Sequence, residues 1–106
     1  MPQKSLEDFT LSELQAYVQS KAVERGFNLT DPSKKLVMLM EEVGELAKAI
    51  RGVVGLKFSS TTEKKEVADE LADVQIVLLG LAQLLEINLA NALKEKEAKN
   101  QERIWS

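Results

Sequence analysis

Hydrophobic residues recur along the chain at intervals of three and four positions, which is the spacing of one face of an α-helix. No segment keeps the strict alternation of apolar and polar residues that is typical of a half-buried strand. Four segments with helical spacing account for most of the 106 residues. The pattern therefore predicts an all-α fold, with a four-helix bundle formed by a single domain over residues 1–106.

Local signals place the ends of the first two predicted helices. The first begins near Thr10, where TLSE has the form of a capping box, and runs to about Gly26. The second opens with Asp31 and Pro32, a helix-capping residue followed by proline at the first helical position. We expect this helix to stop at Gly52, where a loop with two glycines begins.

The third helix is predicted to start near Ser60, with a second capping box between Ser60 and Glu63, and to reach about residue 85. Between residues 67 and 85 it is apolar on nearly every side, so we expect more than one neighbouring helix to bury it. The fourth is expected to begin after Asn88, as its capping residue, and to run toward Arg103.

Two acidic motifs lie beside the best core material, EEVGE at residues 41–45 and ELAD at residues 70–73. At 100° per residue, Glu42 and Glu45 lie along one edge of the apolar face of the second helix, whereas Glu41 points further toward solvent. Glu70 and Asp73 share a largely apolar face of the third helix. Carboxylates in such surroundings carry a large desolvation cost unless they are paired or bind a metal.

Two interpretations of these acids are open. They could form a solvated stripe with ordinary ion pairs, or a carboxylate cage formed where the second and third helices pack antiparallel. The chain has no cysteine and no histidine, which excludes thiolate and imidazole metal sites and histidine-based catalysis. A cage of oxygen ligands alone selects Mg²⁺ or Mn²⁺, and Mg²⁺ usually meets its substrate through phosphate oxygens.

The C-terminal segment offers a basic counterpart. Lys96, Asn100 and Arg103 share one face of the fourth predicted helix and could contact phosphate oxygens, or simply belong to a charged surface with Glu–Lys pairs. Phe27, between the first two helices, could cover the core or stack on a nucleobase.

Composition narrows the function further. The net charge of −3 argues against a general nucleic-acid-binding surface. No apolar run approaches membrane-spanning length, and the first residues do not resemble a signal peptide, so we expect a cytoplasmic protein without membrane contact. A chain this short buries a limited share of its surface, which makes oligomerisation an expected source of further burial.

EEVGE and ELAD, with 24 residues between them, resemble the EExxE…ExxD signature of the MazG-like, all-α nucleoside triphosphate pyrophosphohydrolases. The flanking sequences LVMLMEEVGELAKAIRG and VADELADVQIVLLGLA are similar to the second and third helices of that family. Lys96-x-x-x-Asn100-x-x-Arg103 is similar to its K…N…R segment. The resemblance covers residues 32–105.

The resemblance implies Mg²⁺-dependent hydrolysis of a nucleoside or deoxynucleoside triphosphate between its α- and β-phosphates, by a water molecule that the metal activates. Carried over position by position, the resemblance implies four metal ligands: Glu42, Glu45, Glu70 and Asp73. The resemblance also implies three contacts to phosphate or sugar: Lys96, Asn100 and Arg103. Glu41 would be a further ligand or a catalytic base alongside Glu42 and Glu45, and Phe27 corresponds loosely to an aromatic residue at the base. A homodimer or homotetramer is implied as well.

Two other functions compete with this hypothesis. A catalytically silent helical module could use the acids to bind a structural metal, or could bind a protein partner. A different phosphohydrolase could release a single phosphate, because the residues themselves do not determine which bond breaks.

Overall fold

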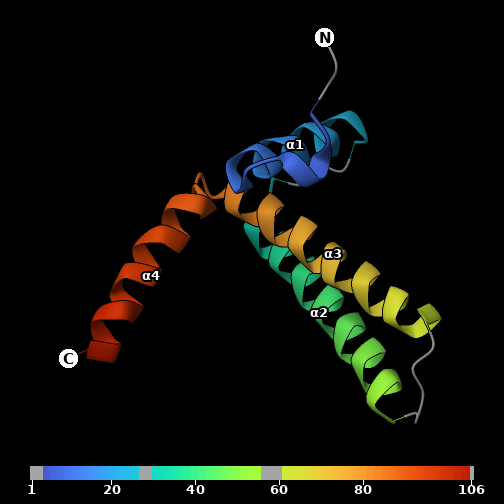
Figure 1. Ribbon diagram of the computed structural model, residues 1–106. Helices are drawn as coiled ribbons and strands as arrows, with labels where there is room; N and C mark the ends of the chain where they lie inside the picture. Colours follow the sequence, from blue (N-terminus) through green and yellow to red (C-terminus); the bar gives the residue numbers. More distant parts are fainter. Residues whose placement is uncertain (1–3, 27–29, 56–60, 106) are drawn as a thin grey trace.

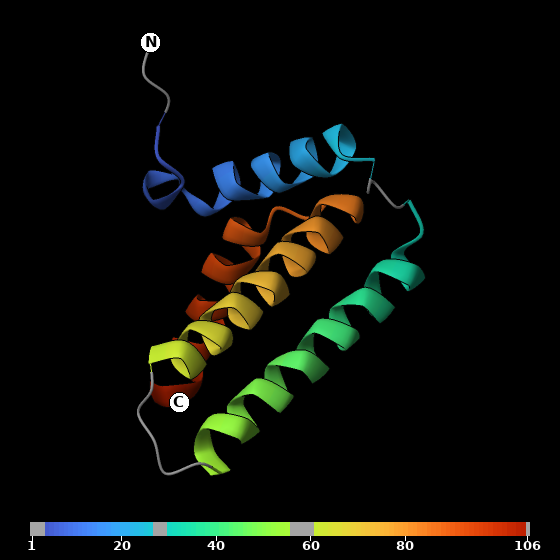
Figure 2. The same ribbon diagram turned by 90° about the vertical axis from the view of Figure 1, so that its right-hand side faces the viewer.

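The computed structural model describes residues 4–26, 30–55 and 61–105. It contains a short 3-10 helix, η1 (Leu6–Asp8), and four α-helices, α1 (Leu11–Glu24), α2 (Pro32–Gly55), α3 (Thr61–Leu84) and α4 (Leu89–Trp105). These described ranges contain no strand, which confirms the all-α class. α2 and α3 pack against each other as a long antiparallel hairpin, α1 crosses one end of it, and α4 points away from it (Figures 1 and 2).

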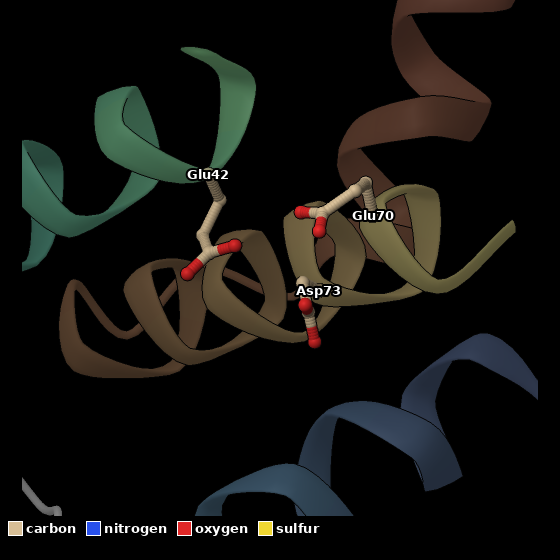
Figure 3. Close-up of side chains that lie close together, drawn as sticks. All are labelled: Glu42, Glu70 and Asp73. Carbon is tan, nitrogen blue, oxygen red and sulfur yellow. The ribbon is translucent and has the colours of Figure 1, made fainter. Parts of the chain in front are cut away.

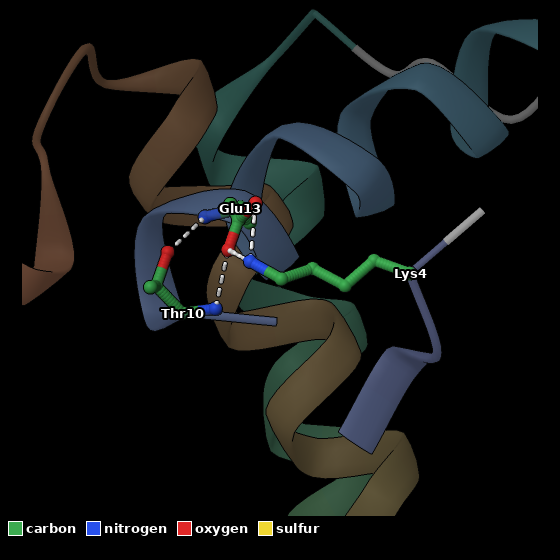
Figure 4. A network of polar contacts seen from close by, with 3 residues as sticks. All are labelled: Lys4, Thr10 and Glu13. Atoms are coloured by element: carbon green, nitrogen blue, oxygen red, sulfur yellow. Dashed lines mark hydrogen bonds and ion pairs between the residues drawn. The ribbon is translucent and has the colours of Figure 1, made fainter. Parts of the chain in front are cut away.

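Three of the four predicted helix starts can be followed in side-chain contacts. The Thr10 hydroxyl accepts a hydrogen bond from the Glu13 N–H at 3.1 Å, and the Thr10 N–H donates to Glu13 Oε1 at 2.8 Å, which completes the predicted capping box (Figure 4). Asp31 Oδ1 accepts from the Ser33 N–H at 2.9 Å at the start of α2. Asn88 caps α4 in the same way, and the capping box predicted at Ser60 lies outside the described residues.

The predicted end of the second helix is wrong, because α2 continues through Gly52 to Gly55. A glycine inside a helix costs only about 1 kcal/mol relative to alanine, so a single glycine does not end a helix that is otherwise supported. Val53, directly after Gly52, is half-buried and continues the packed face of α2. The short helix η1 was not predicted either.

The core lies where α1 crosses the hairpin. Val77, Leu79 and Ala82 of α3 are buried there, and only 2% of Leu79 is exposed. As expected, α3 contacts both α1 and α2. The single chain nevertheless leaves Leu71 and Ile76 of α3 about half exposed, at 53% and 50%.

α3 and α4 are joined by a sharp turn. The Ile87 N–H donates to the Ala82 carbonyl at 2.9 Å and the Glu86 N–H to the Gln83 carbonyl at 3.0 Å, the pattern of a Schellman motif. Glu86 takes the left-handed conformation with φ 58°. The chain bends here by 98°. Across the described ranges, no single helix has both the length and the apolar character needed to cross a membrane, and only α3 and α4 taken together would meet that measure.

Candidate metal centre

Three acidic side chains meet between α2 and α3. Glu42 comes from α2, and Glu70 and Asp73 come from neighbouring turns of α3 (Figure 3). One carboxylate oxygen of each lies within 4.8 Å of the others. The helical spacing of the two motifs and the antiparallel packing of α2 on α3 bring these three groups together.

Glu70 is the member of this group whose carboxylate is least well satisfied. Its Oε2 atom is shielded from solvent and has no hydrogen-bond partner among the described residues. Burial raises the pKa of the Glu70 carboxyl above its ordinary value, and the negative charges of Asp73, Glu42, Glu45 and Asp69 raise it further. A buried carboxylate without a partner is costly, so this position favours either a proton or a cation.

The group fits a hard divalent cation. Mg²⁺ binds oxygen at about 2.0–2.1 Å, so two ligands on opposite sides of one ion lie about 4.2 Å apart. Glu42, Glu70 and Asp73 offer oxygens within 4.8 Å of one another, which is close to the span of one ion and its ligands. The unpartnered Glu70 Oε2 supplies an oxygen without breaking an existing hydrogen bond. Oxygen-only donors are those that Mg²⁺ and Mn²⁺ prefer.

The other two acids of the first motif lie outside this group of three. Glu45 is exposed and, together with Glu70, lines a cavity of about 460 Å³ between α2 and α3. Acidic side chains dominate this cavity, since Glu66 and Asp69 also line it and, among the described residues, Lys48 is the one cation in its lining. Glu41 is exposed on α2, as its place on the helical wheel predicts.

A second cavity, of about 220 Å³, lies where α1 meets the hairpin, on the other side of the three acids. Met38 and Val77 form part of its apolar lining, and they lie one turn from Glu42 and Asp73 respectively. Its cationic lining residues are Lys21, Arg25 and Lys35. Among the described residues, neither Arg25 nor Lys35 forms an ion pair, whereas Lys21 pairs with Glu24 at 3.2 Å.

These cations were not among the residues predicted from the sequence. Lys21 of α1 and Arg25, the residue that follows this helix, are one turn apart, a spacing that places them on one face with Tyr17. Lys35 is two turns before Glu42 on α2, and this spacing was the available signal. Only the packing of α1 across the hairpin brings the three cations together around one cavity.

The predicted phosphate contacts are carried by α4. Lys96 and Arg103 are exposed there and Asn100 is half-buried. α4 diverges from α2 and α3 along its length (Figure 1), so the single chain does not bring this face to the three acids. Phe27, predicted as a core or nucleobase contact, lies outside the described residues.

Comparison with known proteins gives two findings. The family model described as the MazG nucleotide pyrophosphohydrolase domain matches residues 30–104, which include both acidic motifs and most of α4. The chain is also similar to the uncharacterized protein YpjD of Bacillus subtilis (strain 168). The two are 33% identical over 88 residues, which span 82% of this chain and 79% of that protein.

Proposed function

The chain belongs to the MazG nucleotide pyrophosphohydrolase family, and on this premise we propose that it is a Mg²⁺-dependent nucleoside triphosphate pyrophosphohydrolase. The proposed products are a nucleoside or deoxynucleoside monophosphate and pyrophosphate. The observation that supports it best is the unpartnered, buried Glu70 oxygen beside Glu42 and Asp73, since such a group requires a cation when it is ionised. A housekeeping role in the nucleotide pool fits this reaction.

In this proposal Glu42, Glu70 and Asp73 hold the metal, and Glu45 joins them from the edge of the acidic cavity. When bound, Mg²⁺ or Mn²⁺ would neutralise charge on the triphosphate and lower the pKa of a water molecule. Without a cation the acids would repel the substrate, because a triphosphate and a cluster of carboxylates carry charge of the same sign.

The remaining groups bind the substrate and move a proton. Water adds to one of the two phosphorus atoms joined by the α–β bridging oxygen, and that oxygen leaves with the other phosphorus. Glu41 or Glu45, neither of which is within the group of three, accepts the proton of the attacking water. Two cations that line the cavity under α1, the exposed Arg25 and the half-buried Lys35, favour an anionic ligand there.

We keep Lys96, Asn100 and Arg103 as phosphate contacts in this proposal. Because α4 diverges from the three acids within the single chain, association between copies would bring this face and a metal centre together. A homodimer or homotetramer would supply further burial. Leu36, Met40, Val43 and Ile50 fall on one face of α2, and each is between 39% and 59% exposed. An apolar face of this length is the kind that associating helices cover, so we place a second copy on it.

The deciding experiment incubates the purified protein with Mg²⁺ and a panel of standard and modified nucleoside triphosphates, and identifies the products. Monophosphate with pyrophosphate supports the proposal, whereas diphosphate with phosphate would assign a different phosphohydrolase. Absence of turnover with every substrate would favour the non-catalytic module.

Variants test the site itself. Glu42→Gln and Asp73→Asn should each abolish turnover while the helical circular dichroism is retained, because each removes a charged metal ligand. Glu7→Gln, an exposed acid in the short helix η1, is the matched control and should keep wild-type activity. Full activity in Glu42→Gln or Asp73→Asn would contradict the proposed metal centre.

A further inference from the structure

Gln15 is the one polar residue in the described ranges that is fully buried, with 4% of its surface exposed. Its side chain makes three hydrogen bonds to residues that are 68 to 74 positions away. Gln15 Nε2 donates to Gln83 Oε1 at 3.0 Å and to the Ile87 carbonyl at 2.7 Å. Gln15 Oε1 accepts from the Leu89 N–H at 3.0 Å. Both amide hydrogens and the carbonyl oxygen are therefore engaged.

These three contacts go to the three parts of one joint: Gln83 is in the last turn of α3, Ile87 in the turn itself, and Leu89 is the first residue of α4. A fourth contact from α1 lies beside them, since Asn88 Nδ2 donates to the Ser12 hydroxyl at 3.2 Å. α1 thus holds the end of α3, the turn and the beginning of α4 at once.

The direction of α4 depends on this joint. Beyond its first turns α4 diverges from the hairpin, and it is the contact between α1 and α4 that keeps it in place (Figure 1). The far end of the helix, which carries Lys96, Asn100 and Arg103, moves most when the angle at its beginning changes. A small rotation at Leu89 becomes a displacement of several ångströms at Arg103, since a helix rises about 1.5 Å per residue.

We infer that Gln15 is a positioning residue, which sets the angle between α3 and α4 and thereby places the phosphate-contact face of α4. Its three hydrogen bonds go neither to the acids nor to the predicted phosphate contacts, so it acts through the joint. This inference rests on the proposed function for the meaning of the α4 face, but the angle itself is a property of the fold. The angle is therefore measured separately from the activity.

The angle can be measured by pulsed electron paramagnetic resonance between two spin labels. The chain has no cysteine, so Lys65→Cys on α3 and Glu97→Cys on α4 give unique labelling positions, both exposed. Dilution with excess unlabelled protein keeps the measured distance within one chain. We expect one narrow distance distribution, which Gln15→Leu broadens or shifts because leucine fills the space without the three hydrogen bonds. An unchanged distribution in Gln15→Leu overturns the inference.

The kinetic readout uses the unlabelled protein. If α4 is misplaced, the triphosphate binds less well while the metal centre is unaltered. Gln15→Leu should therefore raise KM on the order of ten- to hundredfold, with kcat changed by about twofold or less. A fall in kcat with an unchanged KM would overturn the positioning role. Absence of turnover in the wild type would refute the proposed function, and the distance measurement would still decide the role of Gln15 in the joint.

Two variants keep the test sound. Gln19→Leu makes the same substitution one turn further along α1, at a half-buried residue, and should leave both distance and KM unchanged. If Gln15→Leu does not fold, Gln83→Leu combined with Ser12→Ala removes two contacts of the joint through exposed residues. This double variant should broaden or shift the distance distribution as Gln15→Leu does. A wild-type distribution in the double variant would contradict the inference.

Discussion

The side chain of Lys35 on α2 lies across Gly80 on α3, where a Cβ atom added to Gly80 would be 2.8 Å from Lys35 Cε and 3.2 Å from Nζ. Gly80 is buried, and the other neighbour of such a Cβ, Val18 Cγ1, is at an ordinary contact distance of 4.0 Å. The absence of a side chain at Gly80 therefore leaves the space through which Lys35 reaches the cavity under α1.

We expect Gly80→Ala to raise the free energy of unfolding by at most about 1 kcal/mol, because alanine favours the helix and the flexible end of Lys35 can move aside. Urea unfolding followed by circular dichroism measures the change. Gly52→Ala is the control, since a Cβ there meets nothing within 4 Å. Lys35→Ala should make Gly80→Ala more favourable than it is alone, because the two residues are in contact. Equal effects in both backgrounds would mean that the contact has no energetic consequence.

The pKa of Glu70 gives a prediction for the metal-free protein. Burial, followed by the negative charges of Asp73 and the other nearby acids, raises the pKa of Glu70 above 4.5. Between pH 4.5 and this raised pKa, the folded chain therefore keeps a proton that the unfolded chain has released. The free energy of unfolding should therefore fall as pH rises from about 4.5 through the pKa of Glu70 in the folded state. Glu70→Gln removes this dependence and should raise the Tm of the metal-free protein at neutral pH.

The same variant should respond less to metal. Mg²⁺ raises the Tm of the wild type if it binds the folded chain, and this shift should be smaller in Glu70→Gln. Glu66→Gln, an exposed acid one turn earlier on α3, should behave like the wild type in both measurements. A Tm of metal-free Glu70→Gln below that of the wild type at neutral pH would show that the ionised Glu70 carboxylate is stabilising.

The capping network at the start of α1 should make the free energy of unfolding depend on pH with the opposite sign. The hydrogen bond from the Thr10 N–H, followed by that from Lys4 Nζ, lowers the pKa of Glu13 (Figure 4). This stabilisation is present above about pH 4.5 and is lost as pH falls through the lower pKa of the folded state. Thr10→Ala should cost about 1 kcal/mol of stability at neutral pH. Glu13→Gln keeps an acceptor for the Thr10 N–H and should remove the pH dependence, which thermal unfolding between pH 3 and 6 would detect.

Glu86 provides a prediction about backbone conformation. Its φ of 58° lies in the left-handed region, which costs a residue with a Cβ roughly 1 kcal/mol and costs glycine almost nothing. Glu86→Gly should therefore raise the free energy of unfolding by about 1 kcal/mol without changing the direction of α4. Glu86→Ala is the control and should have little effect, because alanine bears the same backbone cost. A loss of stability in Glu86→Gly would mean that the Glu86 side chain contributes to the turn.

The sequence predicted those parts of the fold that depend on near neighbours. The helix starts at Thr10, Asp31 and Asn88 depend on side chains within three residues of each start, so the local sequence is enough to locate them. The acids Glu42, Glu70 and Asp73 could be associated because their helices pack side by side and each motif has helical spacing. The identity of the bound ion and the roles of the five acids stay predictions.

Contacts between distant segments could not be predicted in this way. Gln15 is one of several glutamines in the chain, and nothing near it in the sequence indicates that it reaches the turn after α3. Lys35 was missed because its position depends on the space at Gly80, 45 residues away, and on α1 crossing the hairpin. The end of α2 was misplaced because a glycine has a cost but does not by itself decide where a helix stops.

The joint held by Gln15 also has a consequence for the order in which the chain folds. α2 and α3 are adjacent in the sequence, so their hairpin closes over a short connection, whereas the bonds from Gln15 to Gln83, Ile87 and Leu89 close loops of about seventy residues. During synthesis α1 emerges before the hairpin, yet its buried glutamine lacks its full set of partners until residue 89 has been made. We therefore expect the hairpin to be the early structure and the anchoring of α4 the final step of folding.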